Sequence, residues 1–191
     1  IYEIFIAEKL AVKDGELQIV KKPENEDRDV VTTPTYIIRE ILRQTITPLC
    51  KDKSAKEILK LKIADIACGS GAFLLEAYQL LNDILIDYYI QHDTSKLVQI
   101  GENSYRLKYA EKKQLLKNCI YGVDKDFNAA EASKFGLLLK LLENEDSASL
   151  INEHPILPDL AKNIFFGNSL LSSCDIKATD ASDINPFDFG T

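Results

Sequence analysis

Three short apolar runs alternate along this chain with longer segments in which apolar residues recur every three or four positions. The runs cover residues 61–68, 119–124 and 163–166, and each has the length of a buried strand. The segments between them, residues 73–89 and 128–142, have helical spacing. Strands that alternate with helices favour parallel pairing and right-handed crossovers. The pattern therefore predicts an α/β doubly wound domain whose ligands lie beyond the carboxyl ends of its strands.

The N-terminal part has a weaker pattern. Residues 1–20 predict a short helix, followed by a possible strand at residues 17–21. A second helix is expected to start after Thr33, which suits the N-cap, and Pro34, which suits the first helical turn. Pro48 is predicted to end that helix.

Composition and charge narrow the class of protein. The chain is 46% hydrophobic and 28% charged, as in ordinary globular domains, and charged residues interrupt its longest apolar helix, so we expect no membrane segment. The net charge of −7 argues against a nucleic-acid surface covering this part. No C-x-x-C pair occurs, which predicts reduced, buried thiols in a cytoplasmic protein and no metal site. The cysteines are Cys50, Cys68, Cys119 and Cys174.

A glycine loop follows the first apolar run, in the sequence DIACGSGAF. A dinucleotide fingerprint would need a glycine where this chain has Leu74, and a Walker A loop would need Gly-Lys. What remains is Asp65 within the strand and a tight turn at Gly69 and Gly71. A carboxylate beside such a turn suits S-adenosylmethionine (SAM), which carries an ammonium and a sulfonium but no phosphate. The alternative is a plain turn in which Asp65 caps a helix.

The other two runs also end in polar residues. Asp124 can accept hydrogen bonds from ribose hydroxyls, although the inserted residues 92–118, with a helix expected at 108–117, lengthen the usual gap of ~20 residues. The alternative role for Asp124 is a helix N-cap, which Asp126 fits equally well. Asn168, in the sequence GNSL, is a candidate acceptor for an adenine amino group, but Gly-Asn turns are common.

Four motifs taken in order carry a family resemblance. TTPTYIIREIL, IADIACGSGAFL, IYGVDKDFNAAEASKFGLLL and NIFFGNSL resemble the adenine-specific N6 DNA methyltransferases of restriction–modification systems, in the gamma arrangement. The long insertion before IYGVD is similar to fused restriction–methylation enzymes of the type IIG, Eco57I-like class. The resemblance covers residues 1–171 and implies an incomplete SAM-dependent methyltransferase (Rossmann-like) fold, with the first three strands and an N-terminal helical segment.

The resemblance also implies which residues bind the cofactor. Thr33 and Pro34 match the motif at the methionine end of SAM. Asp124 matches the ribose-binding acid, with Lys125 beside the adenine ring. Asn168 matches the position that reads the adenine, which is more often Asp in this class. The cofactor loop matches at Asp65, Ala67, Cys68, Gly69, Gly71 and Phe73.

The family's catalytic motif, [DNS]-P-P-[YFW], has no good match. Residues 185–188, NPFD, lack the second proline and follow no apolar strand; they resemble the connector that precedes that strand. We therefore expect no catalytic residue in this chain, which would be the N-terminal part of a methylase. Residues 1–29 would form an N-terminal segment and linker, residues 30–171 the SAM-binding part, and residues 172–191 the connector.

The expected partners follow from this interpretation. DNA would be bound through the full-length enzyme, and the missing fourth strand would leave a sheet edge free for self-association. We expect weak SAM binding and no methyl transfer by the chain alone. The open alternatives are a SAM-dependent RNA or protein methyltransferase and a non-catalytic modification or specificity subunit with a relict methylase fold. An NAD enzyme is disfavoured by Leu74.

Overall fold

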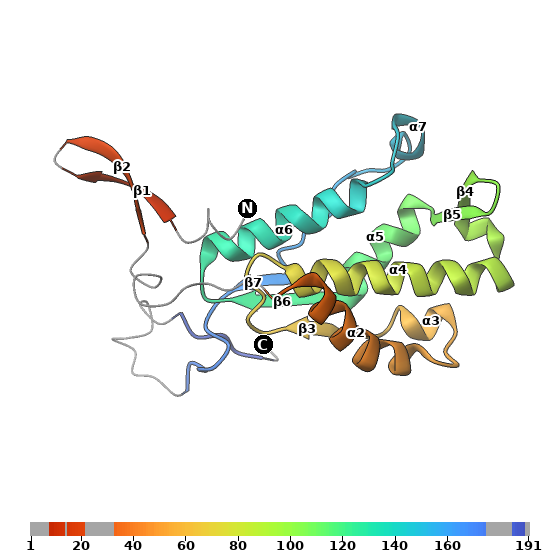
Figure 1. The fold of residues 1–191 in the computed structure, drawn as a ribbon, viewed down its shortest axis with the longest axis horizontal. Helices are drawn as coiled ribbons and strands as arrows, with labels where there is room; N and C mark the ends of the chain where they lie inside the picture. The colour runs from red at the N-terminus through yellow and green to blue at the C-terminus, as the bar shows by residue number, and fades with distance from the viewer. Residues whose placement is uncertain (1–7, 14, 22–32, 175–184, 190–191) are drawn as a thin grey trace. The chain divides into compact units, whose positions relative to one another are not determined.

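The computed structural model describes residues 8–13, 15–21, 33–174 and 185–189. The chain divides into two compact units, residues 1–34 and residues 35–191. The smaller unit holds an antiparallel hairpin of β1 (Glu8–Lys13) and β2 (Glu16–Lys21), drawn in red in Figure 1. The second unit holds all the remaining described elements.

Strand β2 confirms the strand predicted at residues 17–21, whereas β1 corrects the helix predicted for residues 1–20, whose first seven residues lie outside the described ones. Leu10 pairs with Ile19 and Val12 with Leu17, so the large apolar residues recur at every second position, which is the spacing of a strand. The turn between the strands carries Asp-Gly, a strong hairpin signal, and Gly15 has a φ of +82°. The turn chemistry therefore outweighs the partial helical spacing of this segment.

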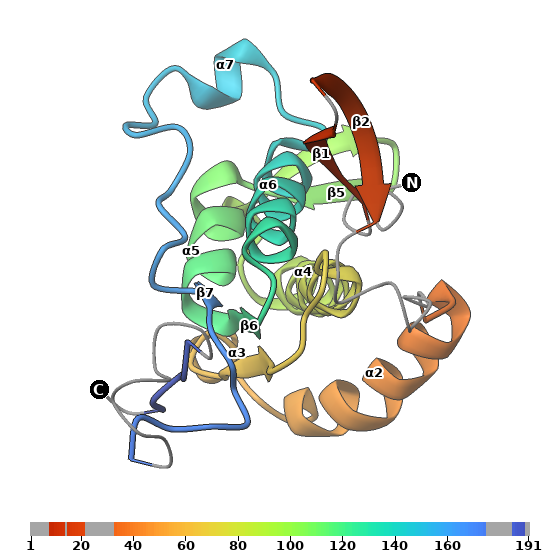
Figure 2. The same cartoon turned by 90° about the vertical axis from the view of Figure 1, so that its left-hand side faces the viewer.

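A three-stranded parallel sheet forms the centre of the second unit. Its order is β3 (Ile63–Asp65), β6 (Ile120–Asp124) and β7 (Ile164–Phe166), and all three strands fall within the predicted apolar runs. Helix α4 (Ala72–His92) follows β3, and α6 (Phe127–Leu142) follows β6. Both helices pack against the sheet and against each other (Figure 2). The mixed α/β fold with a parallel sheet is thus confirmed.

The insertion between α4 and β6 contains a second hairpin that the sequence pattern did not predict. After a short 3-10 turn at Thr94–Lys96, β4 (Leu97–Gly101) pairs with β5 (Ser104–Leu107). Helix α5 (Tyr109–Cys119) then leads into β6, as expected. The insertion packs against α4 and α6 within the same compact unit, and its last helix leads into β6, which pairs with β3.

Helix α2 (Thr35–Cys50) packs on α4 through a buried face of Ile38, Leu42 and Ile46. It continues through Pro48, which corrects the predicted end of this helix. Pro48 lies in the last turn, where its missing N–H removes a single hydrogen bond and the turn can still close. Two one-turn helices, α3 (Ala55–Ile58) and α7 (Ser147–Leu150), lie in the connections.

The hydrophobic core centres on α4, whose Leu74, Tyr78, Leu81 and Leu85 are almost completely buried. Three cysteines are buried as expected, but Cys174 is exposed, because it lies in the polar segment after β7. Among the described helices, none combines the length and the apolar character needed to cross a bilayer.

Candidate functional site

The chain segments that leave the three parallel strands are tied together by hydrogen bonds. The N–H of Cys68, after β3, donates to the carbonyl of Val123 in β6 at 3.0 Å. The N–H of Gly167, after β7, donates to the carbonyl of Asp124 at 2.8 Å. The hydroxyl of Ser169 donates to the carbonyl of Ile66 at 2.6 Å, which links the third segment back to the first. The carboxyl edge of the sheet is therefore one connected site.

The glycine loop has the backbone geometry that only glycine adopts easily. Gly69 and Gly71 have φ angles of +53° and +88°. A Cβ on Gly71 would lie 2.5 Å from the buried Ser133 Oγ, whereas a Cβ on Gly69 would meet no atom within 4 Å. Gly71 is thus required by packing against α6, and the space above Gly69 is open to a ligand.

Asp124 holds this loop with its carboxylate. Its Oδ2 accepts from the N–H of Gly69 at 2.7 Å, and its Oδ1 accepts from the N–H of Asp126 at 2.8 Å. Each oxygen keeps a further lone pair for another donor. The N-cap of α6 is Asp126, whose side chain accepts from the N–H groups of Asn128 and Ala129. Asp126 and not Asp124 is therefore the N-cap of α6.

Asp65 turns back onto its own loop and does not cap α4, whose N-cap is Gly71. Its Oδ1 accepts from the N–H of Ala67 at 3.1 Å. Burial raises the pKa of Asp65, the nearby charge of Asp124 raises it further, and the hydrogen bond from Ala67 opposes both. A cation bound here would relieve the repulsion between the two carboxylates.

A cavity of about 290 Å³ adjoins Asp65. It is otherwise apolar, with Phe73 of α4 and Leu42 of α2 among its lining residues. The thiol of Cys68, by contrast, is buried between the loop and the sheet, and burial raises its pKa to about 12. Cys68 is therefore an uncharged packing residue of the loop.

Asn168 lies where β7 ends, and its Oδ1 accepts from the N–H of Leu170 at 3.1 Å. Two aromatic rings stand next to this position. Phe127 and Phe166 meet edge to face at 5.7 Å between centroids, and they are 55% and 46% exposed. Large rings exposed beside polar strand ends offer a surface on which a planar base can stack.

No protein-family model matches the chain, but two curated proteins do. The type II restriction enzyme and methyltransferase RM.Eco57I of Escherichia coli is 57% identical over 190 residues, which are 98% of this chain and 19% of that protein. The chain is Eco57I-like. This confirms the predicted resemblance to Eco57I-like restriction and methylation enzymes, while adenine specificity stays a prediction. A protein of Methanocaldococcus jannaschii, whose name gives the same two activities provisionally, is 35% identical over 125 residues.

The Eco57I-like chain spans only a small part of these relatives. It covers 19% of the length of the first and 9% of the second, whose match takes in 62% of this chain. The names of both relatives give restriction and methylation, but they do not state which base is methylated.

Hydrogen bonds within the loop and to β6 bring together six of the predicted cofactor residues: Asp65, Ala67, Cys68, Gly69, Gly71 and Asp124. Asn168 lies beside them, because the hydroxyl of its neighbour Ser169 donates to the carbonyl of Ile66. Lys125 is exposed just after β6. Thr33 and Pro34 belong to the smaller unit, so their predicted contact with SAM stays a prediction. Sequence reasoning missed Phe127 and Phe166; their signal was a pair of large aromatic residues immediately beside two polar strand ends.

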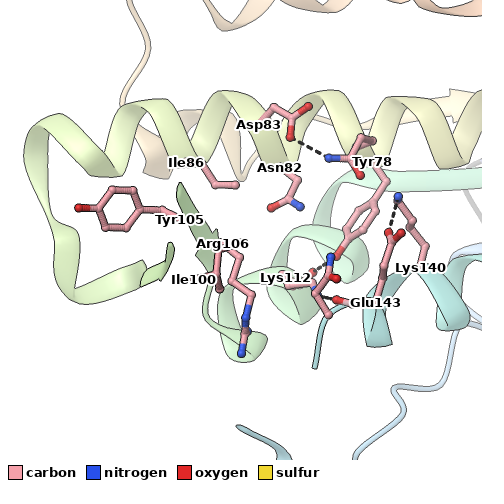
Figure 3. A pocket seen from close by; sticks show the side chains of 12 residues that line it. Tyr78, Asn82, Asp83, Ile86, Ile100, Tyr105, Arg106, Lys112, Lys140 and Glu143 are labelled. Atoms are coloured by element: carbon pink, nitrogen blue, oxygen red, sulfur yellow. Dashed lines mark hydrogen bonds and ion pairs between the residues drawn. The ribbon is translucent and has the colours of Figure 1, made fainter. Parts of the chain in front are cut away.

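A second cavity, of about 170 Å³, lies between α4, the β4–β5 hairpin and α5 (Figure 3). Within the described part of the chain, none of the residues assigned to SAM lines it. Its wall includes Lys112, which ion-pairs with Glu145 at 2.9 Å while Arg106 donates to the same carboxylate at 2.8 Å. This cluster holds the inserted hairpin and α5 to the segment that follows α6, so we interpret it as structural.

Proposed function

We propose that this chain is the SAM-binding portion of an N6-adenine DNA methyltransferase within an Eco57I-like restriction–modification enzyme. One observation carries the proposal: Asp124 Oδ2 fixes the N–H of Gly69 at 2.7 Å beside open space, in a chain 57% identical to a named methyltransferase. The parallel sheet and the helix after each of its first two strands support a Rossmann-like methyltransferase fold.

The residues at the strand ends suit the chemistry of SAM. Asp124 keeps lone pairs for the ribose hydroxyls, and the backbone bonds from Gly69 and Asp126 hold it in place. Asp65 lies close enough to Asp124 for the charge of Asp124 to raise its pKa. It offers a second carboxylate for the cationic end of the cofactor. Phe127 and Phe166 supply the apolar surface for the adenine, and Asn168 the hydrogen-bonding edge.

SAM, when bound, supplies an electrophilic methyl group for transfer to an exocyclic amine. The chain's own task is to hold and orient that cofactor. The sequence contains no [DNS]-P-P-[YFW] tetrapeptide, so the groups that accept the adenine amino protons would come from the rest of the longer enzyme. DNA would be bound there as well, in keeping with the net charge of −7 on this chain.

Self-association is part of the same proposal. Strand β3 pairs with β6 on one side, and within the described residues no strand pairs with its other edge. An unpaired edge is a template for another strand, which would be a second copy of the chain or a strand of the longer enzyme. Light scattering over a concentration series tests this; a monomer at every concentration would contradict self-association.

Isothermal titration calorimetry of the chain with SAM, S-adenosylhomocysteine, NAD and ATP tests the cofactor assignment. We expect weak binding of SAM and S-adenosylhomocysteine only. In a separate incubation of the chain with labelled SAM and duplex DNA, we expect no methyl incorporation. Tighter binding of NAD would overturn the assignment. No binding of any ligand would favour a non-catalytic modification subunit with a relict fold.

A further inference from the structure

The segment NPFDF, residues 185–189, belongs neither to the residues assigned to the cofactor nor to a catalytic motif. The structure places residues 185–189 directly against the exit of β7. Asn168 forms a parallel bridge with Pro186: its N–H donates to the carbonyl of Asn185 at 2.7 Å, and its carbonyl accepts from the N–H of Phe187 at 3.1 Å. Both backbone groups of Asn168 are therefore held by residues 185–189, which we name the clasp.

Three further contacts fix the clasp to the same exit. The side-chain amide of Asn185 donates to the carbonyl of Phe166 at 3.2 Å, and the N–H of Phe187 is shared with the carbonyl of Leu171 at 3.1 Å. Asp188 accepts from the N–H of Ser173 at 2.8 Å and from its hydroxyl. The clasp thus contacts the chain on both sides of Asn168.

Aromatic packing selects the side chain at position 187. The Phe187 ring lies 5.1 Å from that of Phe165 and 4.9 Å from that of Phe189, between centroids. A Cβ on Gly167 would lie 3.0 Å from the Cβ of Phe187, so Phe187 would have to shift to make room for any side chain before Asn168. The backbone bonds and the ring contacts point to one specific docked position.

We propose that the clasp positions Asn168 so that its side-chain oxygen can read the cofactor's adenine amino group. That oxygen accepts one hydrogen bond, from Leu170, and a carbonyl oxygen has a second lone pair. The clasp orients the backbone from which this side chain projects, so Phe187 is a positioning residue for adenine selectivity. This role rests on the proposed SAM function, but the existence of the clasp does not.

The first arm of the test needs no ligand. Residue-resolved amide exchange by NMR is measured on the full chain and on Phe187→Ala, Phe187→Tyr and Phe135→Ala. Phe135 is a matched control, a phenylalanine 53% exposed within α6. Without the Phe187 ring the clasp should undock, and the N–H of Asn168 should lose its hydrogen bond to the carbonyl of Asn185. We therefore expect exchange at Asn168 to accelerate about tenfold in Phe187→Ala only, the effect of one hydrogen bond of ordinary strength. Exchange at Gly69 stays unchanged because it is bonded to Asp124. Unchanged exchange at Asn168 overturns the clasp.

The second arm compares S-adenosylhomocysteine with S-inosylhomocysteine, which lacks the amino group. We expect the parent chain to prefer the first by about tenfold, the contribution of one hydrogen bond. In Phe187→Ala this ratio of affinities falls toward one. In Phe187→Tyr, which keeps an aromatic ring, the ratio stays as in the parent chain. Equal weakening of both ligands would mean that the clasp only stabilises the fold, which overturns its positioning role. Failure of the parent to bind either ligand overturns the proposed function, and the exchange arm still decides whether the clasp exists.

Discussion

The backbone N–H of Gly69 and the Oδ2 of Asp124 are 2.7 Å apart, although 55 positions separate the two residues in the sequence. This bond joins the glycine loop to the end of the neighbouring strand. We expect Asp124→Ala to lower the free energy of unfolding by about 2 kcal/mol, because two backbone donors lose a charged acceptor. SAM affinity should fall by at least about tenfold, because the ribose would lose that acceptor too. Urea unfolding and calorimetry measure the two effects.

Asp126→Ala is the matched control for that variant. It removes the N-cap of α6 and should lower stability by about 1 kcal/mol, yet it leaves the backbone N–H that donates to Asp124. SAM affinity should therefore be unchanged. Equal losses of affinity in the two variants would mean that the effect comes from general destabilisation, and the role given to Asp124 would be wrong.

The two loop glycines should respond differently to alanine. Gly69→Ala meets no atom within 4 Å, so it should cost only about 1 kcal/mol for its left-handed backbone while it weakens SAM binding. Gly71→Ala should destabilise the fold more, because its Cβ would lie 2.5 Å from Ser133 Oγ. Combining it with Ser133→Gly should recover part of that loss in thermal unfolding. A purely additive double variant would show that the contact with Ser133 is not the cause.

Asp65 should make the free energy of unfolding depend on pH. Burial raises its pKa above 3.8, the value for an exposed Asp, so ionisation is less favourable in the folded state than in the unfolded one. The resulting loss of stability is fully present above the raised pKa and absent below the ordinary value. Asp65→Asn should therefore stabilise the chain at neutral pH, and its advantage should shrink as the pH falls toward about 4. Urea midpoints over this range measure it. The same variant should bind SAM more weakly, since a cation loses its carboxylate.

The ion-pair cluster of the insertion should matter for folding alone. Glu145 has a side chain only 1% exposed, and it pairs with both Arg106 and Lys112. Glu145→Gln leaves these cations without a counter-charge and should cost about 3–5 kcal/mol of unfolding free energy. Glu131→Gln, which breaks an exposed pair with Lys134, should cost less than about 0.5 kcal/mol. Loss of stability in the second variant comparable to the first would contradict this assignment.

Cysteine chemistry offers a simple check of the fold. Cys174 is exposed, whereas burial raises the pKa of Cys68 to about 12 and of Cys119 to about 11. A thiol reagent at neutral pH should therefore modify Cys174 quickly and the buried cysteines only after unfolding. Rapid modification of Cys68 in the folded chain would mean that the glycine loop opens.

Much of the sheet could be predicted from the sequence, because buried strands leave a local signal. The three apolar runs and α4, α5 and α6 all fall where the spacing placed them. The second strand of the hairpin was predicted at residues 17–21, but its partner β1 was assigned to a helix because a few apolar residues fit helical spacing, although the Asp-Gly turn between the strands is a hairpin signal.

The geometry of the site could not be read in the same way. Asp124 and Asp126 are equivalent as sequence, and only the hydrogen bonds of the folded chain assign the N-cap to Asp126. The bridge between Asn168 and Pro186 is also non-local, and no periodicity encodes which strand end the segment of residues 185–189 docks against. Local sequence pattern therefore predicts the helices and strands, whereas contacts between distant parts of the chain determine the role of each polar residue at the strand ends.

The hairpin of β4 and β5 has a practical use in the laboratory. Its tip, at Glu102 and Asn103, is a solvent-exposed turn, while its base is anchored through Arg106 to Glu145, in the segment that follows α6. An epitope or fluorescent reporter inserted at this tip should be tolerated, since exposed loop tips accept insertions best. Such a label would follow the protein in solution or on DNA without touching the residues assigned to SAM.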